Sequence, residues 1–265
     1  MVGRLIGASL RALLVGVLLA LTLTTMPDVS AAAADAFSLI TIVICGFVLV
    51  EYGFRQPALL EFRFANPYNR WRFASLVMIM MSFVVLCGNV HAPTPLNICI
   101  KWLADFSQRI LDFPFSPVFV MRGFLENDIS QKALDMIVPM ASLGFLIAVA
   151  STLLFIAYIF SSDWPVQGGT FHFWSNLPTF QTLQPENAGS RLFQAGLLNI
   201  IFALMVPYGA PLVVKNLSDV LPIQSFVGDF ALFWIISFVT WLPLAFAMRG
   251  IALYKVSRMI RTEQA

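Results

Sequence analysis

The amino-acid sequence predicts an all-helical integral membrane bundle that crosses the bilayer about six times. Of its 265 residues, 59% are apolar and only 11% are charged, and the mean hydropathy is +0.82. A soluble domain carries about 25% charged residues, so a water-soluble fold could not cover its surface with so few. Six apolar stretches are also long enough to span a bilayer, which takes about 20 residues each. We therefore expect residues 1–265 to form a single membrane domain.

The predicted spans follow one another along the chain. They lie at residues 8–26, 36–54, 74–90, 135–160, 192–214 and 226–248. The longest connection, residues 91–134, follows the third span, and a second long connection, residues 161–190, follows the fourth. No internal repeat and no low-complexity tail is evident in the sequence. The chain therefore has no stretch that we expect to fold as a separate soluble domain.

The first stretch allows two interpretations. A basic start, an apolar core and the small residues before residue 34 are typical of a cleaved signal peptide. Small residues also recur every four positions, which places them on one helix face where another helix can approach closely. They are Ala8, Ala12, Gly16, Ala20 and Thr24. We favour a retained helix, because a removable leader needs no packing face, and the sequence leaves cleavage open.

Lysine and arginine set the predicted orientation, because they are enriched in cytoplasmic segments. With the N-terminus inside, the inner segments hold eleven basic residues and the outer segments hold five. The inner residues are Arg4, Arg11, Arg55, Arg63, Arg70, Arg72, Arg191, Arg249, Lys255, Arg258 and Arg261. The outer residues are Lys101, Arg109, Arg122, Lys132 and Lys215. We therefore expect both termini to be cytoplasmic, and we expect the membrane to be a bacterial inner membrane.

The outer connection, residues 91–134, contains an amphipathic helix over residues 98–113. Its polar stripe consists of Lys101, Asp105, Gln108 and Asp112. Its apolar side consists of Cys99, Trp102, Leu103, Phe106, Ile110 and Phe113. Such a helix either lies in the outer interface and caps the bundle, or packs as an ordinary helix through its apolar face. The sequence does not decide between these two placements.

Cap signals mark the elements that follow this helix. Ser116 and Pro117 are typical of an N-cap and a first helical position, so a short helix is expected through Leu125. Asp128 with Gln131 resembles a capping box that opens the fourth span. Within that span, Pro139 predicts a kink. A second face of small residues is formed by Gly144, Ala148 and Thr152.

The inner connection, residues 161–190, is unusually aromatic. Its aromatic residues include Trp164, Phe171, Phe173, Trp174 and Phe180. One interpretation is a belt folded back onto the bilayer, because Trp and Tyr favour the headgroup level. A second is a surface on which another membrane subunit docks. A third is a ligand pocket that uses His172 or Asn176. All three stay open at the level of sequence.

Ionisable and polar residues inside spans are candidates for function by default. Arg11 and Glu51 match in depth on adjacent antiparallel spans, so we expect a structural ion pair between them. Span five carries the run VPYGAP, which predicts a helix break, and discontinuous helices line substrate sites in transporters. The resulting candidates for a transport site are Asn199, Pro207 and Asp229.

No convergent catalytic or metal-binding set is evident. His91 and His172 fall on opposite sides of the bilayer and cannot share a metal, and no motif such as HExxH, GxSxG or a P-loop occurs. We therefore expect neither an enzyme nor a metal site, and no cofactor beyond bound lipids. Cys87 and Cys99 both fall outside, where oxidation is feasible, so a disulfide between them is sterically open. The net charge of +2 gives no reason to expect a nucleic-acid partner.

These features favour a non-enzymatic membrane subunit, or an assembly and stabilising factor, of a larger membrane protein complex. Its expected partners are the lipid bilayer and other membrane subunits. The alternative is a small transporter or permease component with a site near spans five and six. The first interpretation predicts a stoichiometric partner, and the second predicts a single species that binds a solute.

Overall fold

A computed structural model describes most of the chain. It describes residues 2–26, 29–54, 59–88, 93–126, 130–166, 171, 173–180, 185–220 and 229–264. The predictions that concern His91 and His172 lie outside these residues, as does Asp128 itself. The side chains of Trp174 and Asp229 also lie outside the described part, although both residues belong to helices. The capping box predicted from Asp128 and Gln131 is wrong, because helix α6 (Gln131–Ser161) begins with Ser130 as its N-cap, whose side chain accepts from Ala133 N at 3.3 Å.

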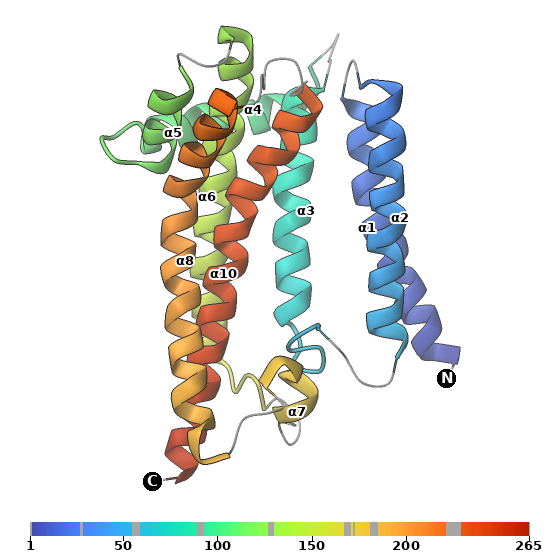
Figure 1. The fold of residues 1–265 in the computed structure, drawn as a ribbon, viewed down its shortest axis with the longest axis vertical. Helices are drawn as coiled ribbons and strands as arrows, with labels where there is room; N and C mark the ends of the chain where they lie inside the picture. The colour runs from blue at the N-terminus through green and yellow to red at the C-terminus, as the bar shows by residue number, and fades with distance from the viewer. Residues whose placement is uncertain are drawn as a thin grey trace.

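The predicted fold class is confirmed: the described residues form helices and loops with no strand, and six of the helices are long and apolar enough to cross a membrane. These are α1 (Val2–Thr25), α2 (Ala31–Gly53), α3 (Tyr68–Cys87), α6 (Gln131–Ser161), α8 (Pro185–Val220) and α10 (Asp229–Gln264). Both termini lie at the same end of the bundle (Figure 1). We call this the terminal end.

The main bundle consists of α3, α6, α8 and α10, and α10 packs against the other three. Small residues allow the close contacts. A Cβ atom at Gly144 of α6 would lie 2.7 Å from Thr240 and 2.8 Å from Phe83. Ala148, one turn further on, is buried as well. The predicted small-residue face of this span therefore packs inside the bundle, as expected from the rule that small residues let helices approach.

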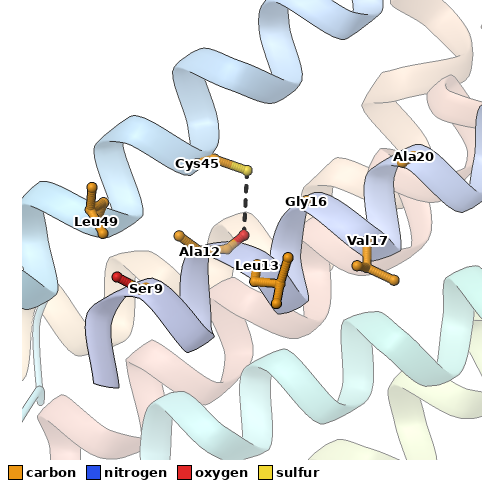
Figure 2. A pocket seen from close by; sticks show the side chains of 8 residues that line it. All are labelled: Ser9, Ala12, Leu13, Gly16, Val17, Ala20, Cys45 and Leu49. Atoms are coloured by element: carbon orange, nitrogen blue, oxygen red, sulfur yellow. Dashed lines mark hydrogen bonds between the residues drawn. The ribbon is translucent and has the colours of Figure 1, made fainter. Parts of the chain in front are cut away.

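The α1–α2 hairpin stands beside this bundle (Figure 1). Gly16 of α1 lies directly against Cys45 of α2, where an added Cβ would come within 2.9 Å of the sulfur. The Cys45 thiol donates to Ala12 O at 3.4 Å, and Figure 2 shows this contact in the apolar groove between the two helices. Ala20 and Thr24 are exposed. The predicted small face of the first span therefore packs in its N-terminal half only.

Helices α4 (Pro95–Leu111) and α5 (Pro117–Leu125) lie at the end opposite the termini (Figure 1). The predicted cap of α5 is confirmed, because the Ser116 side chain accepts a hydrogen bond from Phe119 N at 3.0 Å. Helix α4 buries Ala104 and Ser107, and it packs against α6. The side of α4 that packs against the bundle is therefore its side of small residues, and not its aromatic side.

The aromatic side of α4 faces outward. Trp102 and Phe106 are exposed and stack on each other, with ring centroids 5.4 Å apart. Ile110 and Phe113 are exposed as well. An apolar face that the chain itself leaves uncovered is typical of a helix that lies in a membrane interface. The arrangement therefore favours the first of the two placements that the sequence allowed.

The structure differs from one prediction about local structure and decides one possibility that the sequence left open. Helix α8 runs from Pro185 to Val220 without a break at Pro207 or Pro211, because a helix in a bundle tolerates proline where neighbouring groups satisfy the freed carbonyls. No disulfide joins Cys87 to Cys99 in the structure, and the Cys87 thiol donates to Met140 Sδ at 3.4 Å.

Candidate functional site

A buried ion pair joins a loop at the terminal end to α10. Arg249 donates through Nε to Glu61 Oε2 and through Nη2 to Glu61 Oε1, each at 2.7 Å. Glu61 is 7% exposed. This two-point geometry is the strongest arrangement of a guanidinium and a carboxylate, because both N–H groups lie along acceptor directions. The loop of residues 59–67 is thereby fixed to the helix bundle.

Two further side chains complete this polar centre. Asn199 of α8 accepts a hydrogen bond from Arg249 Nη1 at 3.2 Å, and its amide nitrogen donates to Ala195 O at 2.7 Å. The Thr179 hydroxyl donates to Glu61 Oε1 at 2.5 Å. The Glu61 carboxylate therefore accepts three donors, from α10 and from the segment η1 (Pro178–Phe180). We call Glu61, Thr179, Asn199 and Arg249 the polar centre.

Two glycines let α8 and α10 approach closely beside the polar centre. A Cβ at Gly250 would lie 2.8 Å from Gly196 O and 2.7 Å from Ile200 Cγ1. A Cβ at Gly196 would lie 3.0 Å from Gly250 O. The two backbones are thus in direct contact one residue from Arg249 and one turn from Asn199. This crossing brings the asparagine within reach of the guanidinium.

The aromatic connection covers the polar centre from the terminal end. The short helix α7 (Phe173–Asn176) places the Asn176 carbonyl to accept from Phe62 N at 2.6 Å, and the Asn176 side-chain oxygen accepts from Phe64 N at 3.0 Å. Trp164 Nε1 donates to Ala65 O at 3.2 Å. Asn176 is thereby occupied in holding the loop, so the structure gives it no place in a ligand pocket.

Trp164 is 1% exposed, and its ring lies 5.4 Å from that of Phe62. Phe171, Phe173 and Phe180 are partly buried against the same hydrophobic core. These described side chains of the connection face the chain's own interior. Trp164 is therefore enclosed by its own fold and cannot be presented to a partner, whereas the docking role of the partly buried Phe171, Phe173 and Phe180 stays a prediction. The aromatic residues seal one end of the bundle.

Helix lengths compare the position of the polar centre with the thickness of a bilayer. At 1.5 Å per residue, the distance along α10 from Phe230 to Arg249 is about 29 Å, and along α3 from Tyr68 to Cys87 it is also about 29 Å. The hydrocarbon core of a bilayer is about 30 Å thick. Arg249 therefore lies as far along α10 from Phe230 as the whole length of α3, within the long apolar stretch Phe230–Arg261. Helices α8 and α10 continue past this level (Figure 1).

The predicted partners Arg11 and Glu51 each make other contacts in the described structure. The Arg11 guanidinium donates to Gly7 O at 2.7 Å and lies 4.6 Å from the centre of the Tyr52 ring. The buried Glu51 carboxylate accepts from Leu59 N at 2.9 Å and from Leu60 N at 3.4 Å. The direct ion pair between Arg11 and Glu51 stays a prediction.

Arg63 ties the same loop to the end of α2. Its Nη1 donates to Glu51 O at 2.6 Å and its Nη2 donates to Tyr52 O at 2.8 Å. Burial lowers the pKa of the Arg63 guanidinium, while the charges of Tyr52 and Glu51 act in the opposite direction. Arg63 thus satisfies two of the carbonyls that a helix leaves open at its C-terminus.

Sequence reasoning found Asn199 but missed Glu61 and Arg249 as site residues. Because the predicted last span ends at residue 248, Arg249 is assigned to a loop. Apolar residues, however, follow Arg249 as well as precede it. Apolar residues on both sides of Arg249 are the sequence pattern that indicates an ionisable residue inside a long apolar helix. Of the other two transport candidates, Pro207 is buried within α8, more than two turns from Asn199, and the Asp229 side chain lies outside the described part.

These observations define the class of the protein as a multi-pass helical membrane bundle with a buried polar centre that joins a loop to α8 and α10. Among the residues that the structure describes, no group of three metal-ligating side chains occurs. Comparisons of the chain with protein-family models, with curated proteins and with solved structures gave no match.

Proposed function

We propose that the chain is a non-enzymatic membrane subunit, or an assembly factor, of a larger membrane protein complex. The observation that carries the proposal is the exposure of α2. Glu51 is the only buried residue of this 23-residue helix within the described structure. A helix that is apolar on all sides belongs inside lipid or against other apolar helices.

The exposed side of α2 has the composition of a helix-packing surface. It carries Gly46, where an added Cβ would meet nothing within 4 Å, and the exposed side chains of Ile42, Val43 and Val50. Helices associate in membranes where small residues allow close approach. The proposed occupant is therefore an apolar transmembrane helix of another subunit, packed at Gly46.

Gly46→Trp is expected to lower the recovery of a stoichiometric partner by about tenfold while the chain itself stays folded. The new ring fills space that the chain leaves empty, so only an added helix is displaced, and a buried interface contact of 1.4 kcal/mol corresponds to one decade of affinity. Purification in mild detergent followed by mass spectrometry measures the recovery. Leu204→Trp is the matched control, because Leu204 of α8 is also exposed. Equal recovery from both variants, or a chain that never carries a partner, would contradict the proposal.

A small transporter or permease component is the second candidate function. It is favoured by one observation: the contact between Asn199 and Arg249 joins α8 and α10, which correspond to the predicted spans five and six. Charged residues inside spans commonly mark a solute path. Solute uptake that is lost in Asn199→Ala, from a chain that purifies alone, would favour this function over the first.

We further propose that the terminal end faces the cytoplasm of a bacterial cell and that the membrane is the inner membrane. The basis is the excess of basic residues in the segments at that end. Reporter fusions after residues 60, 180 and 265 are expected to be cytoplasmic, and fusions after residues 30, 120 and 220 are expected to lie outside. A fusion at residue 180 that is active outside would reverse the proposed orientation.

A further inference from the structure

Three buried polar atoms around Arg72 have no hydrogen-bond partner in the structure. They are Tyr68 Oη, Arg72 Nε and Trp241 Nε1. The Arg72 guanidinium lies 5.5 Å from the centre of the Tyr68 ring and 5.7 Å from that of Trp241. The Tyr68 oxygen lies close enough to accept from the Arg72 guanidinium, so the groups that still require an acceptor are the Tyr68 hydroxyl hydrogen, Arg72 Nε and Trp241 Nε1. Buried polar groups are normally satisfied, and three unpartnered donors in one place indicate that an acceptor from outside the chain binds there.

The surroundings of Arg72 are positively charged. Arg63 lies 5.5 Å from the centre of the Tyr52 ring, close to Arg11 on the same ring. In the described part of the chain, these two guanidiniums donate to main-chain carbonyls rather than to a carboxylate. Two carboxylates lie near these guanidiniums: Glu61 is held by Arg249, and Glu51 accepts from Leu59 N and Leu60 N. The three arginines Arg11, Arg63 and Arg72 therefore still outnumber the carboxylates beside Tyr52. The expected acceptor is therefore negatively charged.

The location is the headgroup level of the bilayer. Tyr68 begins α3 at the membrane boundary, and Arg72 lies one helical turn further in, about 6 Å along the axis. The hairpin joins the main hydrophobic core through residues from its other half, Leu18, Met26 and Val29. The first turns of α1 lie away from α3 (Figure 1).

We propose that Arg72, Tyr68 and Trp241 bind the phosphate group of an anionic phospholipid at the terminal end, with Arg63 and Arg11 adding positive charge beside it. Basic pockets between transmembrane helices bind such headgroups. A phosphate offers several strong acceptor oxygens to a guanidinium, a hydroxyl and an indole N–H at once. Its acyl chains then lie against the apolar side chains between the hairpin and α3. This site is independent of the function proposed above.

Two variants test the site in the full-length purified protein. Native mass spectrometry measures the fraction of protein that retains phosphatidylglycerol or phosphatidylcholine after exchange into a neutral detergent. Arg72→Gln is expected to lower retention of phosphatidylglycerol by about tenfold, since it removes hydrogen bonds to a charged group. Phosphatidylcholine retention is expected to stay low in every variant. Arg122→Gln is the matched control, because Arg122 is an exposed arginine of α5 at the opposite end.

Tyr68→Phe keeps the test decisive if Arg72→Gln fails to fold. Removing an unsatisfied buried hydroxyl is neutral or stabilising, so this variant is expected to melt at the same or a higher temperature than the parent in neutral detergent. With phosphatidylglycerol added, the parent is expected to gain more in melting temperature than the variant does.

Three results would overturn the proposal. The first is equal retention of phosphatidylglycerol by the parent and by both site variants. The second is an equal gain in melting temperature from phosphatidylcholine, which would mean that water alone satisfies the three donors. The third is that millimolar inorganic phosphate stabilises the protein as well as the lipid does, which would identify the occupant as a free anion.

Discussion

Arg249→Gln is expected to destabilise the folded bundle by about 3 kcal/mol, because it leaves the buried Glu61 carboxylate without its charged partner. Glu61→Gln is expected to have a similar effect, since the guanidinium is then left with only Asn199 as a partner. The double variant is expected to be less destabilised than the sum of the two single variants, because neither charge remains to be buried alone. A double-mutant cycle of unfolding in mixed detergent micelles measures this coupling.

The control for this cycle is Arg191→Gln. Arg191 is an exposed arginine of α8, and surface charges contribute little to stability. It is expected to change the unfolding free energy by less than about 0.5 kcal/mol. Purely additive effects of the Glu61 and Arg249 variants would show that this ion pair does not fix the loop of residues 59–67 to α10, despite the 2.7 Å contacts.

Much of this architecture follows from local patterns in the sequence. Apolar stretches of sufficient length predicted all six spans, because length and hydropathy are properties of each segment alone. The Ser116 cap was predicted for the same reason, since the cap and the helix that it starts are adjacent in the chain. The stripe of polar residues on α4 likewise required only helical periodicity.

The polar centre could not be predicted in this way. Glu61 and Arg249 are far apart in the sequence, and their pairing depends on the crossing of α8 and α10 and on the path of a loop. The placement of Trp164 shows the same limitation, because composition indicated an interfacial or docking aromatic, whereas its indole donates to Ala65 O inside the bundle. Local sequence gives the kind of residue, and tertiary packing decides which way it faces.

The crossing of α8 and α10 yields the last prediction, which concerns Gly250. Gly250→Ala is expected to destabilise the protein by about 2 kcal/mol, because overpacking forces well-packed groups apart. The added methyl group would lie 2.8 Å from Gly196 O and 2.7 Å from Ile200 Cγ1. A backbone oxygen cannot rotate away as a flexible side chain can, so the two helices must separate.

Gly46→Ala is the matched control for Gly250→Ala, and the two variants are expected to change stability in opposite directions. Alanine is a better helix former than glycine by about 1 kcal/mol, and at Gly46 the new methyl group meets nothing within 4 Å. Gly46→Ala should therefore unfold at a slightly higher temperature than the parent, and Gly250→Ala at a clearly lower one. Separation of the helices should also weaken the hydrogen bond from Arg249 to Asn199, so Gly250→Ala combined with Asn199→Ala should be less destabilised than the sum of the two. If Gly250→Ala instead raises the unfolding temperature as Gly46→Ala does, the helices are not in backbone contact, and the close crossing does not position the polar centre.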